Sequence, residues 1–425
     1  MSDPKHKAPP TSRLRRLGDL ARVGLRTGAA AIAGSQTSAA EHARDVLGNL
    51  RGLATKLGQM ASYVDGVVPE EQRAAFETAL TTLRAQAPRS PPAEMRKTME
   101  EAWGKRAEEL FTDWTDEPVA SASIGQVYRA TLRDNGRIVA IKVQHARIHE
   151  ALESDLANAG VLRAIVGAAA GRRFNSKELF DIARERFREE LDYALEARRI
   201  DAFVAMHEGD PQIRIPRVVH ALSSQRVLVT DWASGVDFDA ACAAPEAARR
   251  AWAETMWRFV FKGNLKQGLF NADPHPGNYI FHDDGVVSFL DFGCVQEIKP
   301  EARAQANVAH AAAMRGDRAG FRSAMRTLLG IPTGSLGDAA VAYSERCFDP
   351  LFMSPFHITR AYATEVVSLF KDLAKDARAV DEREFFNMPP HMLFMNRLQF
   401  GFYSVLARLD VSVDYAAVER GFLEG

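Results

Sequence analysis

Asn271-Ala-Asp273-Pro-His-Pro-Gly-Asn278 is the stretch around which the chain is organised, and Leu290-Asp291-Phe292-Gly293 follows it after a short strand. Asp273 and Asn278 show a D-x-x-x-x-N spacing. In phosphoryl transfer one carboxylate orients the attacking hydroxyl, while an amide oxygen and a second carboxylate hold Mg²⁺ against phosphate oxygens. Asp, Pro and Gly are also common in turns, so either piece alone would be ordinary turn chemistry. Their order and combination favour Asp273 as a catalytic residue and Asn278 and Asp291 as metal ligands.

A lysine stands upstream in the strand where such chemistry needs one. Residues 118–132 read as a strand, a loop of small residues and a second strand, and Asp134-Asn-Gly136 is typical of a hairpin turn. The third strand is Ile138-Val-Ala-Ile-Lys142-Val143. A strand ending in V-A-I-K places its lysine against the α- and β-phosphates of a nucleotide. We therefore expect Lys142 to be both nucleotide-binding and catalytic.

The loop before that lysine should cover the phosphates, although it has an unusual composition. Glycine is the usual residue where backbone approaches phosphate closely, and only Gly125 provides it here. Small side chains and hydroxyls can still admit a phosphate. The expected nucleotide-binding residues of this loop are Ala120, Ser121, Ala122, Ser123 and Gly125.

An acidic segment supplies candidate partners for the lysine. A helix predicted from Ser176 to about Glu208 contains Arg188-Glu-Glu190-Leu-Asp192-Tyr-Ala-Leu-Glu196. Acidic clusters on helices usually form a solvated face. A kinase-like site, however, needs one helix carboxylate to orient its lysine. Glu196 is the first candidate for that role and Glu190 the second.

The spacing of the elements predicts an α+β, protein-kinase-like bilobal fold. Residues 213–219 and 226–230 would complete a five-stranded antiparallel sheet, and Asp231 and Trp232 would begin a hinge that binds the nucleotide base. The expected divisions are a basic flexible or amphipathic segment (1–35), a helical extension (36–115), an N-lobe (116–230) and a helical C-lobe (231–425). No Ala-Pro-Glu segment follows Gly293, which argues against a docked peptide substrate.

Composition limits the setting and the partners. The net charge of −1 gives no overall field that would favour nucleic acid, although residues 1–60 carry ten Lys and Arg against four Asp and Glu. A basic amphipathic helix over 13–33 could contact a membrane surface peripherally or pack on the protein. No window approaches 18 uninterrupted apolar residues, so we expect no membrane span. Three cysteines, far apart, fit a reducing compartment. We expect a cytoplasmic location, with peripheral membrane association as the alternative.

Four motifs in order resemble those of the UbiB-type atypical kinases, also called the AarF family. Lys56-Leu-Gly-Gln59 resembles the K-x-G-Q signature of that family, and Ala120-Ser-Ala-Ser123 its alanine-rich loop. Glu190-Leu-Asp192 is similar to its E-x-D signature. The D-x-x-x-x-N stretch and the Asp-Phe-Gly triplet resemble its catalytic and metal-binding elements. Asn271 departs from the pattern, because many members have His at this position.

The resemblance implies an N-terminal extension that packs over the active site, with Lys56 and Gln59 near Glu190 and Asp192. It also implies ATP or ADP with Mg²⁺, and a kinase or ATPase that acts on a small or lipid-like molecule or supports ubiquinone and isoprenoid-lipid metabolism. Two alternatives stay open. One is a nucleotide-gated scaffold for a biosynthetic complex, and the other is a phosphotransferase of the antibiotic-kinase type. Protein partners are not indicated by any motif.

Overall fold

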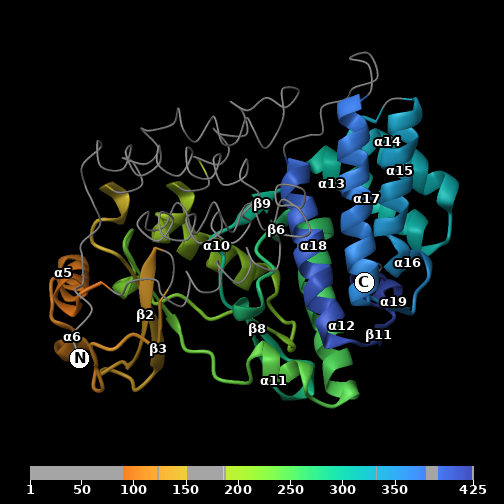
Figure 1. Ribbon diagram of the computed structural model, residues 1–425. Coiled ribbons are helices and arrows are strands. Elements are labelled where there is room, and N and C mark those ends of the chain that lie inside the picture. The colour runs from red at the N-terminus through yellow and green to blue at the C-terminus, as the bar shows by residue number, and fades with distance from the viewer. Residues whose placement is uncertain are drawn as a thin grey trace, which may run out of the picture. The chain divides into compact units, whose positions relative to one another are not determined.

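The computed structural model describes residues 90–121, 124–150, 185, 188–331, 333–379 and 391–423. The chain divides into two compact units (Figure 1). The first unit comprises the described residues up to Ala197 together with Val218–Trp232. The second unit comprises Arg198–Arg217 and the described residues from Ala233 onward. The segment 198–217 therefore groups with the second unit. The expected segment 1–35, most of the expected extension 36–115, and Lys56 and Gln59 lie outside the described residues.

A four-stranded antiparallel sheet forms the centre of the first unit. Its strands lie in the order β1 (Ala120–Ser121), β2 (Gly125–Thr131), β3 (Ile138–Gln144) and β5 (Val227–Asp231). The turn between β2 and β3 contains Gly136 at a φ of 70°, a conformation that glycine adopts without strain. The hairpin is therefore where the sequence predicts it.

The expected fifth strand, 213–219, does not join this sheet among the described residues. Its first part, β4 (Ile213–Arg214), pairs with a strand of the second unit, and Val218 makes only an isolated bridge to Thr230. Pro216 separates the two parts. Because proline has no N–H to donate to a ladder, one continuous strand is disfavoured here. The five-stranded prediction is thus not confirmed.

Two helices cover the sheet of the first unit. They are α5 (Pro92–Trp103) and α6 (Ala107–Leu110), and α5 packs against β3 and β5. Met95 and Met99 are almost fully buried with Val139, Ile141 and the other apolar residues of the strands. Removing this apolar surface from water, at roughly 25 cal/mol per Å², is what fixes α5 on the sheet. The helix that carries Glu196, α10 (Tyr193–Met206), begins in this unit and ends in the second.

The second unit is mainly helical. Its longer helices are α12 (Glu246–Lys262), α13 (Pro300–Met314), α14 (Arg318–Leu329), α15 (Ser335–Cys347), α17 (Arg360–Ala379), α18 (His391–Leu409) and α19 (Tyr415–Leu423). Short helices are α11 (Phe238–Cys242) and α16 (Asp349–Phe352), and a π-helical turn, η2 (Gly263–Gln267), follows α12. Figure 1 shows α13, α14, α15 and α17 grouped together, and α13 packs on α14 while α15 packs on α17.

Short strands in this unit carry the loops of interest. β6 (Leu269–Asn271) pairs antiparallel with β9 (Val295–Glu297), and β7 (Tyr279–Phe281) pairs antiparallel with β8 (Val287–Phe289). β4 lies parallel to β8, and β10 (Phe356–His357) pairs with β11 (Ser412–Val413). Single turns of 3₁₀ helix are η1 (His220–Leu222), η3 (Pro276–Asn278) and η4 (Asp283–Gly285). The two ladders β6–β9 and β7–β8 therefore hold both ends of the Asp273–Asn278 loop.

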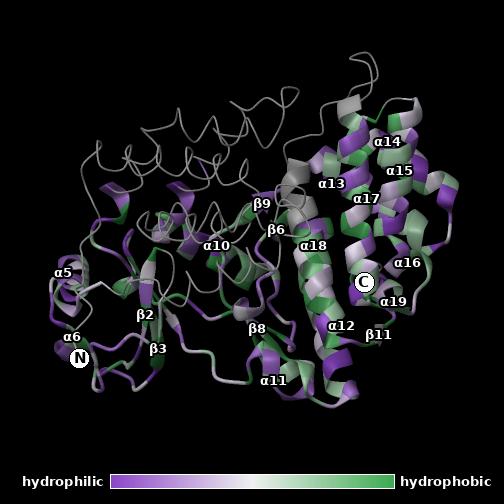
Figure 2. Ribbon diagram, viewed as in Figure 1, coloured by the Kyte–Doolittle hydropathy of each residue, from purple (hydrophilic) through white to green (hydrophobic). Residues whose placement is uncertain are grey.

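The core of the second unit is aromatic. Trp257 is buried and its ring centroid lies 4.1 Å from that of Tyr415 and 6.0 Å from that of Phe402. Hydrophobic and hydrophilic residues both occur along α14, α15 and α17, as expected for helices with one buried face (Figure 2). Within the described ranges, no helix is long and apolar enough to cross a membrane.

Candidate active site

A buried carboxylate holds Lys142 in the first unit. The Nζ atom of Lys142 lies 3.0 Å from both Oε1 and Oε2 of Glu196, and Glu196 is only 4% exposed. The ammonium also lies 5.1 Å from the ring centroid of Tyr193. Lys142 stands in the middle of β3, between Val127 of β2 and Leu228 of β5. Glu196, the first candidate from the sequence, is thus the residue that pairs with Lys142 in the structure.

The E-x-D residues lie at the start of the helix that carries Glu196. Asp192 immediately precedes α10, and its Oδ1 accepts a hydrogen bond of 3.0 Å from the N–H of Leu195. This is an N-cap contact, which satisfies one of the unpaired amides at a helix start. Glu190 is half-buried shortly before it. The expected contacts of Glu190 and Asp192 with Lys56 and Gln59 stay predictions, because both latter residues lie outside the described part.

The small-residue loop is described at both ends. Ala120 and Ser121 form β1, opposite Val127 and Gln126 of β2, whereas Ala122 and Ser123 lie outside the described residues. A Cβ atom at Gly125 would lie 2.3 Å from the carbonyl oxygen of Val143. Glycine is therefore required here by the close approach of β3, in addition to any approach by phosphate.

The predicted hinge residues are already engaged through their side chains. Asp231 forms an ion pair with Arg137, and the guanidinium of Arg129 lies 5.8 Å from the ring centroid of Trp232. The Trp232 N–H donates to the carbonyl of Ile138 at 3.0 Å. Because bonded and non-bonded pairs alternate along an antiparallel ladder, the backbone of Asp231 points away from β3. Base recognition by Asp231 would therefore use its backbone, and this role stays a prediction.

In the second unit, the residues of the D-x-x-x-x-N motif touch one another. Nδ2 of Asn278 donates to the main-chain oxygen of Asp273 at 3.0 Å and to its Oδ2 at 3.3 Å. The His275 N–H donates to the same main-chain oxygen at 2.7 Å. The loop is therefore a tight turn in which the Asn278 amide nitrogen faces Asp273.

Asn271 ties that loop to the Asp291–Gly293 segment. Its Oδ1 accepts a 3.0 Å hydrogen bond from the Asp273 N–H, and its Nδ2 donates to the main-chain oxygen of Asp291. Two further bonds join the same segments, from the Ala272 N–H to the Cys294 carbonyl at 2.8 Å and from the Leu290 N–H to the Asn278 carbonyl at 3.0 Å. The residue that departs from the expected pattern is thus the side chain that links the two motifs.

Asp291 and Phe292 are fixed by different contacts. Oδ1 of Asp291 accepts the Gly293 N–H at 2.9 Å, which is a local turn. Phe292 is fully buried, with its ring centroid 4.8 Å from that of Phe203 of α10. The packing of the buried Phe292 ring therefore fixes the neighbouring backbone and, with it, the position of Asp291.

Comparison with known proteins identifies the group to which this arrangement belongs. Residues 82–325 match the model of the ABC1 atypical kinase-like domain. The matched range is more than half of the chain and includes the site residues from Ala120 to Gly293. This chain belongs to the ABC1 atypical kinase-like family.

Curated ABC1-family relatives show how far the likeness extends. ACTIVITY OF BC1 COMPLEX KINASE 1, chloroplastic, of Arabidopsis thaliana is 34% identical over 265 residues, which cover 60% of this chain and 38% of that protein. The mitochondrial atypical kinase coq-8 of Caenorhabditis elegans is 32% identical over 250 residues, covering 57% and 32%. These names confirm the UbiB-type resemblance. The match spans between 29% and 51% of the length of the first six curated relatives.

A solved structure shares the ABC1-family fold of this chain. The Rv3197–erythromycin complex from Mycobacterium tuberculosis superposes with a TM-score of 0.63 at 25% identity, covering 92% of this chain and 97% of that one. The likeness to this structure extends over nearly the whole chain, and the kinase-like domain itself is shown over residues 82–325.

The Asp273–Asn278 loop and the Asp291–Gly293 segment provide oxygen atoms that suit Mg²⁺. Since the amide nitrogen of Asn278 faces Asp273, its Oδ1 is the atom left for a cation. Mg²⁺ prefers hard oxygen ligands and usually takes only one or two from protein, the rest from phosphate and water. Within the described part of the chain, no three His, Cys, Asp or Glu side chains gather into a metal site. Asn278 and Asp291 fit a cation that arrives with a nucleotide, and the metal role stays a prediction.

Two residues that support the Asp273–Asn278 loop and the Asp291–Gly293 segment are not predicted from the sequence. Arg199 of α10 donates from Nη1 to the Gly293 carbonyl at 2.9 Å. A Cβ at Gly401, in the middle of α18, would lie 2.6 Å from Cγ of Pro274, so only glycine lets the helix approach the loop. A lone glycine inside a long apolar helix was the available signal for the second. No local pattern marks Arg199.

A buried histidine belongs to the aromatic cluster around Phe292. The ring of His207 stacks on Phe259, with centroids 4.9 Å apart, and Phe259 stacks on Phe289 at 3.6 Å. Neither ring nitrogen of His207 has a hydrogen-bond partner among the described residues. Burial, reinforced by the nearby charge of Lys262, lowers the pKa of His207 to about 3. The imidazole is therefore neutral near pH 7 and acts as an aromatic ring.

Proposed function

We propose that this chain is an ATP- and Mg²⁺-dependent phosphotransferase or ATPase whose acceptor is a small or lipid-like molecule. The observation that carries the proposal is the bidentate pair between Lys142 and the buried Glu196. The Glu196 carboxylate is buried and the Lys142 side chain is 20% exposed, and withdrawing such a pair from water is costly unless the arrangement has a use. Membership of the ABC1 atypical kinase-like family supports that use as phosphate binding.

Each side chain then has a role that its chemistry allows. Lys142, directed by Glu196, neutralises the α- and β-phosphates. Asp273 orients the acceptor hydroxyl or water, because a fixed carboxylate can accept its proton. Asn278 and Asp291 hold Mg²⁺, which supplies positive charge to the phosphate oxygens when it is bound. The Ser121 hydroxyl is buried without a hydrogen-bond partner in the described chain, which fits a donor kept for a ligand.

The acceptor class is inferred from the short connection between the Asp291–Gly293 segment and α13. β9 begins two residues after Gly293, and α13 begins at Pro300. The connection is therefore too short to provide the extended segment on which kinases seat a peptide. The mitochondrial coq-8 relative motivates a link to ubiquinone or isoprenoid-lipid metabolism, and the basic segment 13–33 motivates peripheral contact with anionic lipid.

Turnover of ATP tests the enzymatic part of the proposal. We expect Mg²⁺-dependent release or transfer of the terminal phosphate by the full chain, and a loss of at least about a hundredfold in Asp273→Asn. Asp283→Asn is the matched control, because Asp283 is an exposed aspartate in the turn between β7 and β8. Equal turnover by Asp273→Asn and Asp283→Asn would contradict the role of Asp273. No turnover, combined with full complementation by Asp273→Asn in cells lacking the gene, would instead favour the nucleotide-gated scaffold.

Lipid vesicles test the acceptor and membrane parts. Turnover is measured with neutral vesicles, anionic vesicles, and anionic vesicles that contain an isoprenoid-quinone precursor. The proposal expects stimulation by the precursor, and peripheral contact additionally expects stimulation by anionic vesicles alone. Stimulation by neither would contradict the lipid-like acceptor.

A second candidate is an enzyme or binding protein for macrolide-like molecules. The observation in its favour is the fold-wide likeness to the protein solved as the Rv3197–erythromycin complex. Titration of the full chain with erythromycin, with and without ATP and Mg²⁺, tests it. Saturable binding at micromolar concentration would favour this candidate, and the absence of binding heat would remove it.

A further inference from the structure

In the second unit, an unusual helix end precedes the Asp273–Asn278 loop, which we call the catalytic loop. Helix α12 ends at Lys262 and continues as the π-helical turn η2, after which Gly268 closes the turn at a φ of 72°. β6 starts at the next residue and leads to Asp273. The last carbonyls of a helix have no partner within it and must find donors elsewhere. π-Helical turns occur preferentially near functional sites.

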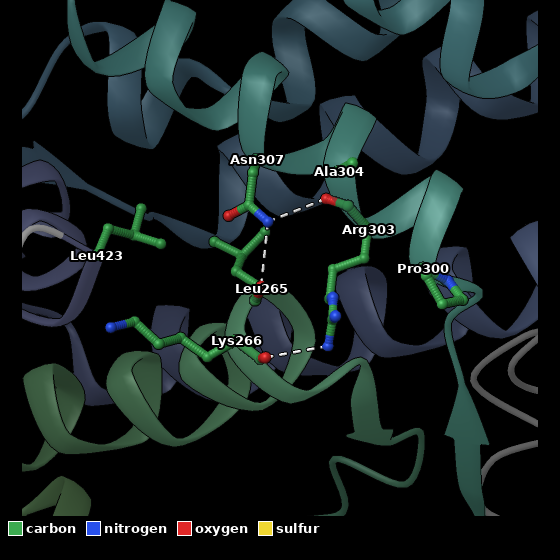
Figure 3. A pocket seen from close by; sticks show the side chains of 7 residues that line it. All are labelled: Leu265, Lys266, Pro300, Arg303, Ala304, Asn307 and Leu423. Carbon is green, nitrogen blue, oxygen red and sulfur yellow. Dashed lines mark hydrogen bonds between the residues drawn. The ribbon is translucent and has the colours of Figure 1, made fainter.

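Two side chains of α13 supply these donors. Nη1 of Arg303 donates to the Lys266 carbonyl at 3.0 Å, and Nδ2 of Asn307 donates to the Leu265 carbonyl at 3.0 Å (Figure 3). Arg303 and Asn307 are four residues apart, so they lie on one face of the helix. Asn307 also bonds back to the Arg303 carbonyl at 3.0 Å, which fixes its rotamer. We call this pair of contacts the α13 clamp.

Close backbone approaches leave the turn little room to move. A Cβ at Gly263 would lie 2.7 Å from the Leu269 carbonyl oxygen, and one at Gly268 would lie 2.9 Å from that of Ile298. The Ile298 N–H donates to the Gly268 carbonyl at 2.7 Å. The start of β6 is therefore in direct contact with the chain that leads into α13. A shift of α13 would move β6 with it.

We propose that Arg303 and Asn307 are positioning residues for the catalytic loop, acting through the carbonyls of the π-helical turn. α13 follows β9 directly, in the region where regulated kinases carry a segment that phosphorylation orders. Here that region is a helix bonded to the turn that precedes β6 and Asp273. The clamp orders the loop without a phosphorylation step. The expected effect of the clamp on turnover rests on the proposed function. Its expected effect on the order of the loop does not.

The clamp lies at the surface and can be changed without opening the core. It borders a groove of about 430 Å³, lined also by Leu265, Lys266, Pro300, Ala304 and Leu423 (Figure 3). Arg303 and Asn307 are half-buried at its side. Arg303→Met keeps the apolar stem and removes the donors, while Arg303→Lys keeps one charged donor on a comparable stem. Arg315→Met is the matched control, since Arg315 is exposed at the other end of α13.

The first experiment is hydrogen exchange of the full chain, which does not depend on any activity. In Arg303→Met and Asn307→Ala, amides of 263–278 should exchange about tenfold faster or more, whereas those of β2 and β3 should not change. Arg303→Lys should lie between Arg303→Met and the parent. Exchange equal to that of Arg315→Met would overturn the proposal. If Arg303→Met fails to fold, the Arg303→Lys and Asn307→Ala comparisons decide the question.

The second experiment separates positioning from binding. If nucleotide turnover exists, kcat of Arg303→Met should fall about ten- to a hundredfold with KM for ATP changed less than about threefold, because misplacing a reacting group affects the chemical step most. Arg303→Lys should recover part of kcat. Faster exchange without any turnover in the parent chain would refute the proposed function and leave the clamp standing. Faster exchange with an unchanged kcat would refute the positioning role, just as unchanged exchange alone would.

Discussion

The lysine site of the first unit and the Asp–Asn loop of the second are held by different kinds of contact. Lys142 is held by a charged partner, Glu196, whose carboxylate is almost fully buried. The loop depends instead on neutral hydrogen bonds through Asn271 and on aromatic packing around Phe292. A buried charge is costly once its partner is lost, whereas neutral hydrogen bonds contribute about 1 kcal/mol each. Disrupting the lysine site should therefore mainly lower the stability of the protein. Disrupting the loop should mainly change the positions of its side chains.

Breaking the ion pair should give the largest effect on stability. Lys142→Met removes the ammonium that pairs with the buried Glu196 carboxylate, and we expect a loss of about 3–5 kcal/mol in the free energy of unfolding. Urea titration followed by circular dichroism measures it. The double variant Lys142→Met/Glu196→Leu should recover much of the loss, because an apolar pair can replace a buried ion pair. A loss below about 1 kcal/mol in Lys142→Met, similar to that of the exposed Lys105→Met, would refute this account.

Removing the amide of Asn271 should cost less stability and affect the loop alone. Asn271→Ala takes away the acceptor of the Asp273 N–H and the donor to the Asp291 carbonyl. We expect a loss of about 2–3 kcal/mol, since two partly buried backbone groups lose partners. Asn271→Asp keeps the acceptor but sets a carboxylate oxygen against the Asp291 carbonyl oxygen, so its loss should be at least as large. Unfolding in urea provides the values, and two variants indistinguishable from the parent would show that Asn271 does not link the motifs.

The aromatic cluster of the second unit should make stability sensitive to acid. Because folding lowers the pKa of His207 from 6.5 to about 3, the unfolded state binds the extra proton between these values. The contribution is fully present above pH 6.5 and is lost as the pH falls toward 3. His207→Phe abolishes this dependence, so its stability relative to the parent should improve by about 2 kcal/mol between pH 7 and pH 5. A parallel pH dependence of the two proteins in urea titrations would exclude the buried neutral imidazole.

The smallest effect should come from the cap of α10. Asp192→Ala removes the acceptor of the Leu195 N–H and should cost about 1 kcal/mol, whereas Asp192→Ser keeps a capping oxygen and should cost less. The two variants also separate the cap from the lid contact predicted with Lys56. If the charge of Asp192 serves such a contact, Asp192→Ser will be stable yet impaired in nucleotide turnover. Thermal unfolding measured beside turnover distinguishes the two roles.

Local spacing was sufficient for much of this site. The V-A-I-K strand and a carboxylate on the following helix point to the pairing of Lys142 with Glu196, and the structure brings the two together. D-x-x-x-x-N likewise describes a turn whose first and last residues touch. These features are predictable because each depends on a short segment with fixed geometry. The same holds for the β2–β3 hairpin, whose turn residues determine its place.

The remaining features depend on contacts between distant segments, which a single sequence does not encode locally. Arg303 and Asn307 look like an ordinary solvated helix face until η2 is placed beside them. Pro216 is visible in the sequence, yet the parallel pairing of β4 with β8 is not, so the predicted sheet has one strand too many. Asn271 stands out in the sequence only as a departure from a pattern. Its role appears once β6 and the Asp291 segment lie together.

Nucleotide titration calorimetry of the full chain tests the central claim most directly. ATP and ADP are titrated into the parent chain, Asp291→Asn and Asp283→Asn, each with Mg²⁺ and with EDTA. The account predicts saturable binding by the parent and by Asp283→Asn that requires Mg²⁺, and affinity at least about tenfold weaker in Asp291→Asn. Binding by Asp291→Asn with parental affinity and Mg²⁺ dependence, or no nucleotide binding by the parent, would contradict it.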